Sequence, residues 1–235
     1  MNTNKRNTKF KLGIGPLVVL LFGALAVSAQ APAQLKELFA RSQQQNAQAL
    51  KQYAWKSRNE VRKNGESKST QIFLMRYDAG GNLQKSQIGG SAPPSMPKGP
   101  LMGHIAQKKK EEFIELVNGL RQQVEAYSHL PPEKMQAFLA SAVITPQLNQ
   151  VLIQIQGQHI LQRGDSMSIW LDAKTRKQRR VEINTFLERN PVKAVIEFGD
   201  LPAGPTYMAR TIVEYPKEAL QLISENFDYK REGRY

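Results

Sequence analysis

The sequence predicts an α+β domain built on a single curved antiparallel β-sheet, a half-open barrel with helices covering its concave face. Eight or nine short segments alternate apolar and polar residues as strands do, and turn-forming residues join nearly all of them. Such short connections permit only antiparallel pairing. Two helical segments fall between the two groups of strands. Because a large twisted sheet curls, we expect these helices to lie in its concavity.

Residues 1–29 have the features of a secretory signal peptide, followed by a single domain at 30–235. The first twelve positions hold four basic residues and no acidic one, and an uncharged apolar stretch, Leu17 to Val27, leads to a cleavage site at Ala29. That stretch spans about 16 Å as a helix, whereas the hydrocarbon core of a bilayer is about 30 Å thick. We therefore predict a periplasmic or secreted protein. Cleavage at Ala31 and an uncleaved anchor are the alternatives.

The composition excludes several classes of protein. Among 235 residues there are 33 Lys and Arg, 20 Asp and Glu, and no Cys, giving a formal net charge of +13. The lack of Cys excludes disulfide scaffolds, thiol catalysis and Cys-based zinc sites. Residues 30–235 keep 29 basic against 20 acidic residues. For an exported basic protein, anionic lipid headgroups, envelope polymers or an acidic protein are the expected partners, rather than nucleic acid.

The first half of the domain is predicted to contain one helix, a three-stranded meander and two further helices. Asn64-Gly65 and the turn at 78–81 separate the strands, and a loop rich in Pro and Gly at 89–103 precedes the helices. The expected elements are a helix at 33–52, strands at 53–63, 68–77 and 83–88, and helices at 104–128 and 132–142.

The second half is predicted to consist of strands and short turns. Arg163-Gly164-Asp165 and Asp172-Ala173-Lys174-Thr175 are turn signals between segments that alternate with a period of two. The expected strands are 151–156, 166–171, 179–185, 192–198, 207–213 and 220–229.

This order of elements resembles the periplasmic lipoprotein-carrier superfamily, the proteins similar to LolA, LolB and RseB. The resemblance covers most of residues 33–230. It is carried by Tyr53-Ala-Trp-Lys-Ser-Arg58, Phe73-Leu-Met-Arg-Tyr-Asp-Ala-Gly-Gly81, Arg163-Gly-Asp-Ser-Met-Ser-Ile-Trp-Leu-Asp172 and Glu225-Asn-Phe-Asp-Tyr229. It implies an N-terminal helix, a curved antiparallel sheet and helices that plug its open face. It also implies binding of an apolar ligand, or protein sensing, at the cell envelope.

In those carriers an Arg near the end of an early strand holds a helical lid shut. Arg76 stands in a comparable place, after Phe73-Leu74-Met75. The carriers have a Pro soon after that Arg, whereas this chain continues with Tyr77-Asp78-Ala79-Gly80. The resemblance therefore implies apolar-ligand binding more than lipoprotein transport in particular.

Apolar side chains on the predicted strands are candidates to line a cavity, and the Met and aromatic ones among them repack easily around apolar ligands. The alternative is that they are simply core residues. Trp170 has the opposite parity to Ile169, so only one of the two can face inward on a regular strand. The candidates are Trp55, Phe73, Met75, Met167, Ile169, Trp170, Ile183, Ile196, Phe198 and Met208.

A cluster of basic residues in the second half is a candidate docking site for anionic headgroups or an acidic partner. Five bases occupy seven positions, and Arg76 is a sixth candidate. The alternative is a solvated hairpin whose cations protect a sheet edge from aggregation. The five are Lys174, Arg176, Lys177, Arg179 and Arg180.

No catalytic residue, metal site or cofactor is predicted. A triad of Ser166, His159 and Asp172 can be written, but Ser166 lacks the Gly-x-Ser-x-Gly turn that exposes a nucleophile. His104 and His129 lie at opposite ends of one predicted helix, and no HExxH spacing occurs. The acidic residues near the later strands show no spacing that selects a glycosidase pair. They are Asp165, Asp172, Glu182 and Glu197.

These observations favour a non-enzymatic periplasmic protein that binds a lipid, acyl chain or lipoprotein in an apolar groove between sheet and helices. The loop at 89–103 would control access to that groove. The alternative is an interaction or stress-sensing module of the envelope, which docks an acidic partner through the basic hairpin at 174–180. A hydrolase that depends on His159 is a third hypothesis.

Overall fold

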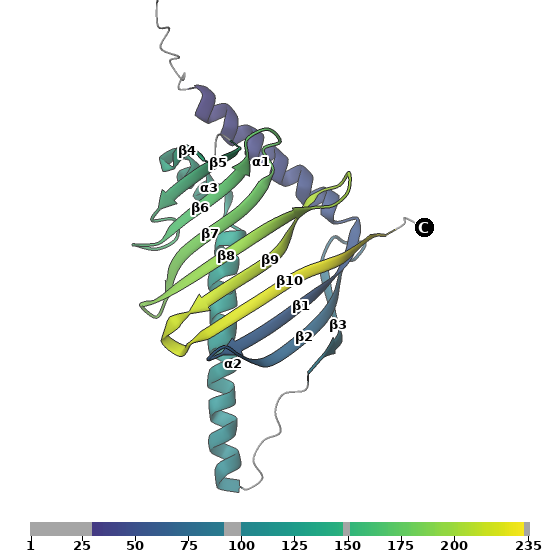
Figure 1. Ribbon diagram of the computed structural model, residues 1–235, viewed down its shortest axis with the longest axis vertical. Helices are drawn as coiled ribbons and strands as arrows, with labels where there is room; N and C mark the ends of the chain where they lie inside the picture. The colour runs from purple at the N-terminus through teal and green to yellow at the C-terminus, as the bar shows by residue number, and fades with distance from the viewer. Residues whose placement is uncertain (1–29, 92–99, 148–150, 233–235) are drawn as a thin grey trace, which may run out of the picture.

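The computed structural model describes residues 30–91, 100–147 and 151–232 (Figure 1). The predicted signal peptide at 1–29 and most of the predicted loop at 89–103 lie outside these ranges. None of the helices in the described ranges has the length and apolarity that a bilayer crossing requires. The helices are α1 (Gln30–Leu50), α2 (Pro100–Ser128) and α3 (Pro132–Ser141).

Ten strands of the described chain form one antiparallel sheet in the order β3-β2-β1-β10-β9-β8-β7-β6-β5-β4. The first three strands make a meander, and the last strand returns to pair with β1, so β3 and β4 remain as two free edges. The strands are β1 (Tyr53–Lys63), β2 (Glu66–Tyr77), β3 (Leu83–Gly90), β4 (Val143–Gln147), β5 (Leu152–Gln158), β6 (Ser166–Asp172), β7 (Gln178–Leu187), β8 (Asn190–Asp200), β9 (Thr206–Tyr215) and β10 (Leu220–Arg231).

The predicted fold class is confirmed: the sheet is curved, antiparallel and unclosed, and helices cover one face. Figure 1 shows α2 running behind the strands and α1 lying across one end of the sheet. A short 3-10 turn, Pro216–Glu218, links β9 to β10. The tight turn between β1 and β2 has positive φ at Asn64 (52°) and Gly65 (79°), as a two-residue hairpin requires.

The apolar core lies between α2 and the inner face of the sheet. Rows of inward side chains cross the strands because alternate residues of each strand point to the same face. One such row joins Ile169, Val181, Ile196 and Thr211 across β6 to β9. From α2, side chains at helical spacing pack against these rows. They are Val117, Leu120, Val124 and Tyr127, all buried.

Strand β4 was not predicted. It is only five residues long and contains Pro146, which has no backbone N–H to donate to a neighbouring strand. The structure accommodates this Pro because β4 is an edge strand, paired only with β5. The remaining strands match their predicted positions to within a few residues.

A buried hydrogen-bond network attaches α2 to the loop between β5 and β6. The Tyr127 hydroxyl donates to Asp165 (2.6 Å), and backbone N–H groups of Ile160, Leu161 and Gln162 donate to the same carboxylate. Burial acts to raise the pKa of Asp165, but these hydrogen bonds outweigh burial and hold the pKa below its ordinary value. In the same environment, desolvation raises the pKa of Tyr127 to about 12, so its hydroxyl remains a donor.

Asp165→Asn tests this network. We expect the free energy of unfolding at neutral pH to fall by about 2 kcal/mol, because a charged acceptor of four hydrogen bonds is lost. The folded-state pKa of Asp165 is depressed, so its stabilisation is present above the unfolded pKa of about 3.9 and is lost as pH falls through the folded value. Urea unfolding at a series of pH values measures both effects, with Glu115→Gln at an exposed position of α2 as control. Equal stability of wild type and Asp165→Asn at pH 7 would contradict this account.

Candidate functional site

An apolar cavity of about 420 Å³ lies at the end of the concave face that α1 covers. This volume falls within the usual range of small-molecule sites. The helices supply one wall, which includes Phe39, Ala47 and Leu50 from α1, Leu130 from the α2–α3 junction and Met135 from α3. The inner face of β1, β2 and β6 to β10 supplies the other wall.

Four aromatic rings form the part of the sheet wall nearest the ends of the strands. Trp55 stacks on Tyr229 with centroids 5.5 Å apart, and its ring lies 5.9 Å from that of Tyr77. Tyr207 contacts Tyr229 with centroids 4.4 Å apart. Desolvation raises the pKa of Tyr229 and of Tyr77, so these hydroxyls are uncharged near neutral pH. The cluster therefore presents neutral aromatic surface to the cavity.

Seven of the ten predicted lining residues contact this cavity. They share one parity on each strand, which places them together on the inner face. The seven are Trp55, Met167, Ile169, Ile183, Ile196, Phe198 and Met208.

The other three predicted lining residues lie elsewhere. Trp170 follows the inward-facing Ile169 on a regular strand and pairs with Arg180, so its side chain points to the convex face. Phe73 and Met75 share the inner face with Trp55, but they lie further toward the β3 edge of the sheet, beyond the cavity wall.

The tyrosines of the cluster and the polar residues of α1 were not among the residues predicted to line a cavity. Tyr77 continues the parity of Phe73 and Met75, so the alternation of β2 could have identified it. Gln43 and Asn46 carried no such signal. They belong to a Gln-rich segment, Ser42 to Gln48, that looks like solvent-facing helix surface, yet both side chains line the cavity.

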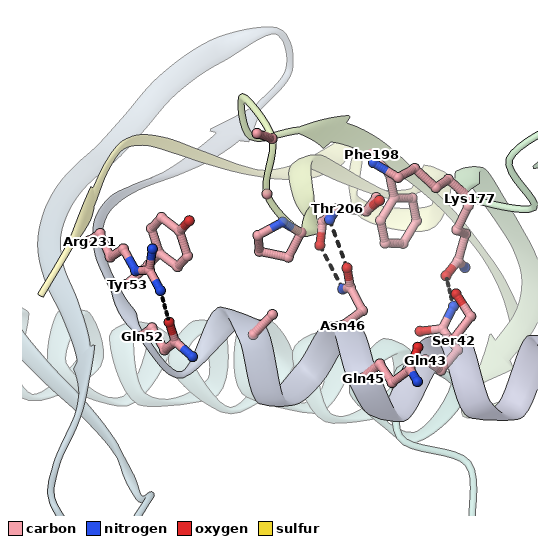
Figure 2. Close-up of a pocket in the computed structure, with 15 residues that line it drawn as sticks. Ser42, Gln43, Gln45, Asn46, Gln52, Tyr53, Lys177, Phe198, Thr206 and Arg231 are labelled. Carbon is pink, nitrogen blue, oxygen red and sulfur yellow. Dashed lines mark hydrogen bonds between the residues drawn. The ribbon is translucent and has the colours of Figure 1, made fainter.

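Side-chain amides hold α1 to the sheet. Asn46 donates from Nδ2 to the backbone carbonyl of Thr206 (2.7 Å) and accepts at Oδ1 from the Thr206 N–H (2.7 Å). Gln43 donates to the side-chain oxygen of Gln178 (2.7 Å). Figure 2 shows these contacts beside a second, more polar cavity of about 450 Å³, where Arg231 also donates to Gln52.

The two cavities share Gln43, Asn46, Gln178, Phe198 and Thr206 in their linings. The hydrogen bonds of α1 therefore stand between the apolar cavity and the polar one. Opening these bonds would join the two spaces.

The basic hairpin is largely neutralised by neighbouring carboxylates. Lys174 and Arg176 are at the turn and form no ion pair within the described residues, whereas the other three bases do. The ion pairs join Lys177 Nζ to Asp200 Oδ1 (3.2 Å), Arg179 Nη1 to Asp200 Oδ2 (2.7 Å) and Arg180 Nη2 to Glu182 Oε1 (2.6 Å).

Arg76 lies between the inward-facing Met75 and Tyr77 on β2, so its exposed side chain points to the convex face. The helices cover the concave face. The structure therefore does not place Arg76 where it could hold a helical lid.

The residues of the possible triad are not assembled. His159 lies in an exposed turn (φ 56°), and its Nδ1 accepts a hydrogen bond from the Gly164 N–H (3.0 Å). Asp172 accepts from the Thr175 N–H in its own turn (2.7 Å). Ser166 and Asp172 begin and end β6, which separates them by about 20 Å. Within the described ranges, no three His, Asp or Glu side chains gather as a metal site would require.

No protein-family model and no curated protein matches the sequence. Two solved structures are similar in fold. One is a DUF1329 family protein from Desulfovibrio piger ATCC 29098, at 7% identity over 86% of this chain and 94% of that chain, with a TM-score of 0.38. The other is a LolA superfamily protein from Nitrosomonas europaea, at 9% identity over 83% and 94%, with a TM-score of 0.35. At this level the similarity concerns architecture alone. The N-terminal helix, the curved unclosed sheet and the helices on its concave face agree with the α+β architecture that the sequence predicts.

Asn46→Ala tests the attachment of α1. The variant loses two hydrogen bonds to the sheet, so we expect the opening of α1 to become more favourable by about 1–3 kcal/mol. Hydrogen–deuterium exchange of the segment 39–50 should accelerate by at least fivefold. Gln48→Ala, an exposed change on the same helix, is the control. Equal exchange in wild type and Asn46→Ala would contradict the role of Asn46.

Proposed function

We propose that this chain is a non-enzymatic protein of the cell envelope that binds a lipid, an acyl chain or the acylated end of a lipoprotein in the cavity beneath α1. The observation that carries the proposal is the apolar space of about 420 Å³ between α1 and the cluster of Trp55, Tyr77, Tyr207 and Tyr229. A single hydrocarbon chain is the ligand that suits such walls, because Met and aromatic side chains adapt to its shape.

The energetics of chain burial support this choice. Each buried methylene contributes about 0.8 kcal/mol, so a lauroyl chain gains enough to leave micromolar affinity after the costs of association. Access requires movement of α1, which breaks three side-chain hydrogen bonds to the sheet. Each contributes only about 0.5–1.5 kcal/mol net, so the part of α1 that follows the buried Phe39 can open without unfolding the sheet.

The predicted signal peptide supports location in the periplasm or outside the cell, where lipid and lipoprotein chains must cross water. Docking of an acidic partner through the basic hairpin is the second hypothesis. It has less support, because three of its five bases already pair with carboxylates of the same chain. The cavity, in contrast, is not filled by side chains of the described residues.

Ala47→Phe tests the proposal, because Ala47 lines the cavity from α1 and is itself solvent-accessible. The larger side chain should occupy the chain's space and lower the affinity for 1-lauroylglycerol at least tenfold, as measured by calorimetry. Gln48→Phe, on the next residue of α1 and outside the cavity lining, is the matched control and should bind normally. Native mass spectrometry of wild type purified from membranes should also show a bound lipid that Ala47→Phe lacks.

A wild-type protein that shows only its apo mass in repeated preparations, and that gives no heat with 1-lauroylglycerol, would overturn the proposed function.

A further inference from the structure

The polar cavity of about 450 Å³ and the apolar cavity of about 420 Å³ meet along one row of α1. Gln43 and Asn46 form this row and belong to both linings. Successive residues of a helix are about 100° apart around its axis, so Ala47 lies on one side of the row and Ala49 on the other. Ala47 lines only the apolar cavity and Ala49 only the polar one. A ligand that occupied both cavities would therefore cross a single row of side chains.

The polar cavity lies between α1 and the loop that joins β8 to β9, and it reaches solvent. Figure 2 shows Tyr53 and Arg231 at one end of this space and Ser42 and Lys177 at the other. Gln45 and Arg231, which also line it, are exposed. A polar group bound here would stay in contact with water while a chain attached to it lay in the apolar cavity.

Several polar groups of this lining have hydrogen-bonding capacity that the described chain does not use. The hydroxyls of Ser42 and Tyr53 are in half-buried residues and form no hydrogen bond with any described residue. A Cβ at Gly204 would lie only 3.2 Å from the Tyr53 hydroxyl, which places that hydroxyl against the β8–β9 loop. Gln178 and Gln52 accept hydrogen bonds at Oε1, from Gln43 and Arg231, but their Nε2 groups donate to no described residue.

The polar lining is mostly uncharged. Among the described residues that form it there is no Asp or Glu, and the two bases already donate to other side chains. Lys177 Nζ lies 3.2 Å from Asp200 Oδ1, and Arg231 Nη2 donates to Gln52 Oε1 (2.7 Å). Hydroxyls and amides therefore supply the unused groups. Because hydroxyls and amides both donate and accept, the chemistry they match best is that of ligand hydroxyls.

We propose that the polar cavity binds the uncharged, hydroxyl-bearing headgroup, such as glycerol or a sugar, of a single-chain amphiphile whose hydrocarbon chain occupies the apolar cavity. This inference rests on the proposed function and adds the class of ligand to it. The junction of chain and headgroup lies beside Gln43 and Asn46. Phe198, which belongs to both linings, contacts the ligand at the same place.

Three ligands with the same lauroyl chain separate the contributions of chain, hydroxyls and charge. They are 1-lauroylglycerol, methyl laurate, which lacks hydroxyls, and 1-lauroylglycerol 3-phosphate, each titrated calorimetrically as a monomer in solution. We expect wild type to bind 1-lauroylglycerol at least fivefold more tightly than methyl laurate, because its two hydroxyls gain hydrogen bonds in the polar cavity. The phosphate ligand should bind no more tightly than 1-lauroylglycerol.

Ser42→Ala/Tyr53→Phe removes two hydroxyls from the polar cavity. The preference for 1-lauroylglycerol over methyl laurate should fall to less than twofold, with the affinity for methyl laurate unchanged. The unfolding temperature should also be unchanged, because neither hydroxyl bonds to a described residue. Ser86→Ala/Tyr215→Phe is the matched control, since it removes the same two groups from positions outside both linings, and it should keep the preference.

Ala49→Phe tests the same site by filling it. The larger side chain should lower the affinity for 1-lauroylglycerol to that for methyl laurate, and methyl laurate should bind as it does to wild type. Ala47→Phe, which fills the apolar cavity instead, should weaken both ligands. The two variants thus distinguish the site of the headgroup from the site of the chain.

Equal affinity of wild type for 1-lauroylglycerol and methyl laurate would overturn the inference while leaving the proposed function intact. A tenfold preference for the phosphate ligand would overturn it in favour of an anionic headgroup. A preference for 1-lauroylglycerol that survives either Ser42→Ala/Tyr53→Phe or Ala49→Phe would also overturn it. Failure of wild type to bind any of the three lauroyl ligands would count against the proposed function itself.

Discussion

The space beneath α1 stays open because different forces hold the two large helices to the sheet. Helix α2 packs apolar side chains such as Leu120 and Val124 directly onto the rows of the inner face, and both are buried. Helix α1 inserts Phe39 into the same core, but further along its length it is held by the amides of Gln43 and Asn46. These side-chain hydrogen bonds hold α1 away from the inner face of the sheet without filling the space beneath the helix. The cavity is that unfilled space.

The different attachments of α1 and α2 determine which of the two helices can move at lower cost. A helix released from an apolar core exposes its packed surface to water, at a cost of about 25 cal/mol per Å². A helix released from side-chain hydrogen bonds exchanges them for bonds to water at much lower cost. Helix α2 is further anchored by Tyr127, which donates to the buried Asp165. Ligand access is therefore expected at the part of α1 that follows the buried Phe39 and is held by Gln43 and Asn46, with α2 remaining on the sheet.

The architecture could be predicted from the sequence because alternation and turn residues are local signals. The turn at Asn64-Gly65 and the row through Ile169, Val181 and Ile196 follow from them directly. Seven of the apolar residues selected on the predicted strands line the cavity. Trp170 was selected together with Ile169, although parity allows only one of these neighbours to face inward, and the structure places Trp170 on the opposite face. Strand β4 was missed because an edge strand tolerates a Pro that a central strand would not.

The remaining features depend on contacts between distant segments. Nothing in the Gln-rich stretch of α1 indicates that Asn46 pairs with the backbone of Thr206, 160 positions later. Local sequence patterns predict which face of a strand or helix a residue lies on. Contacts between segments far apart in the sequence can be identified only from the three-dimensional structure.

The two tryptophans offer the most direct measurement, since Trp55 forms part of the cavity wall and Trp170 lies on the convex face. A brominated fatty acid should quench the fluorescence of Trp55 saturably in Trp170→Phe, because the chain carrying the bromines would lie against the ring. The same ligand should leave Trp170 unquenched in Trp55→Phe, and the unbrominated acid should quench neither. Equal quenching of both tryptophans, or none of Trp55, would contradict the claim that a hydrocarbon chain occupies the space beneath α1.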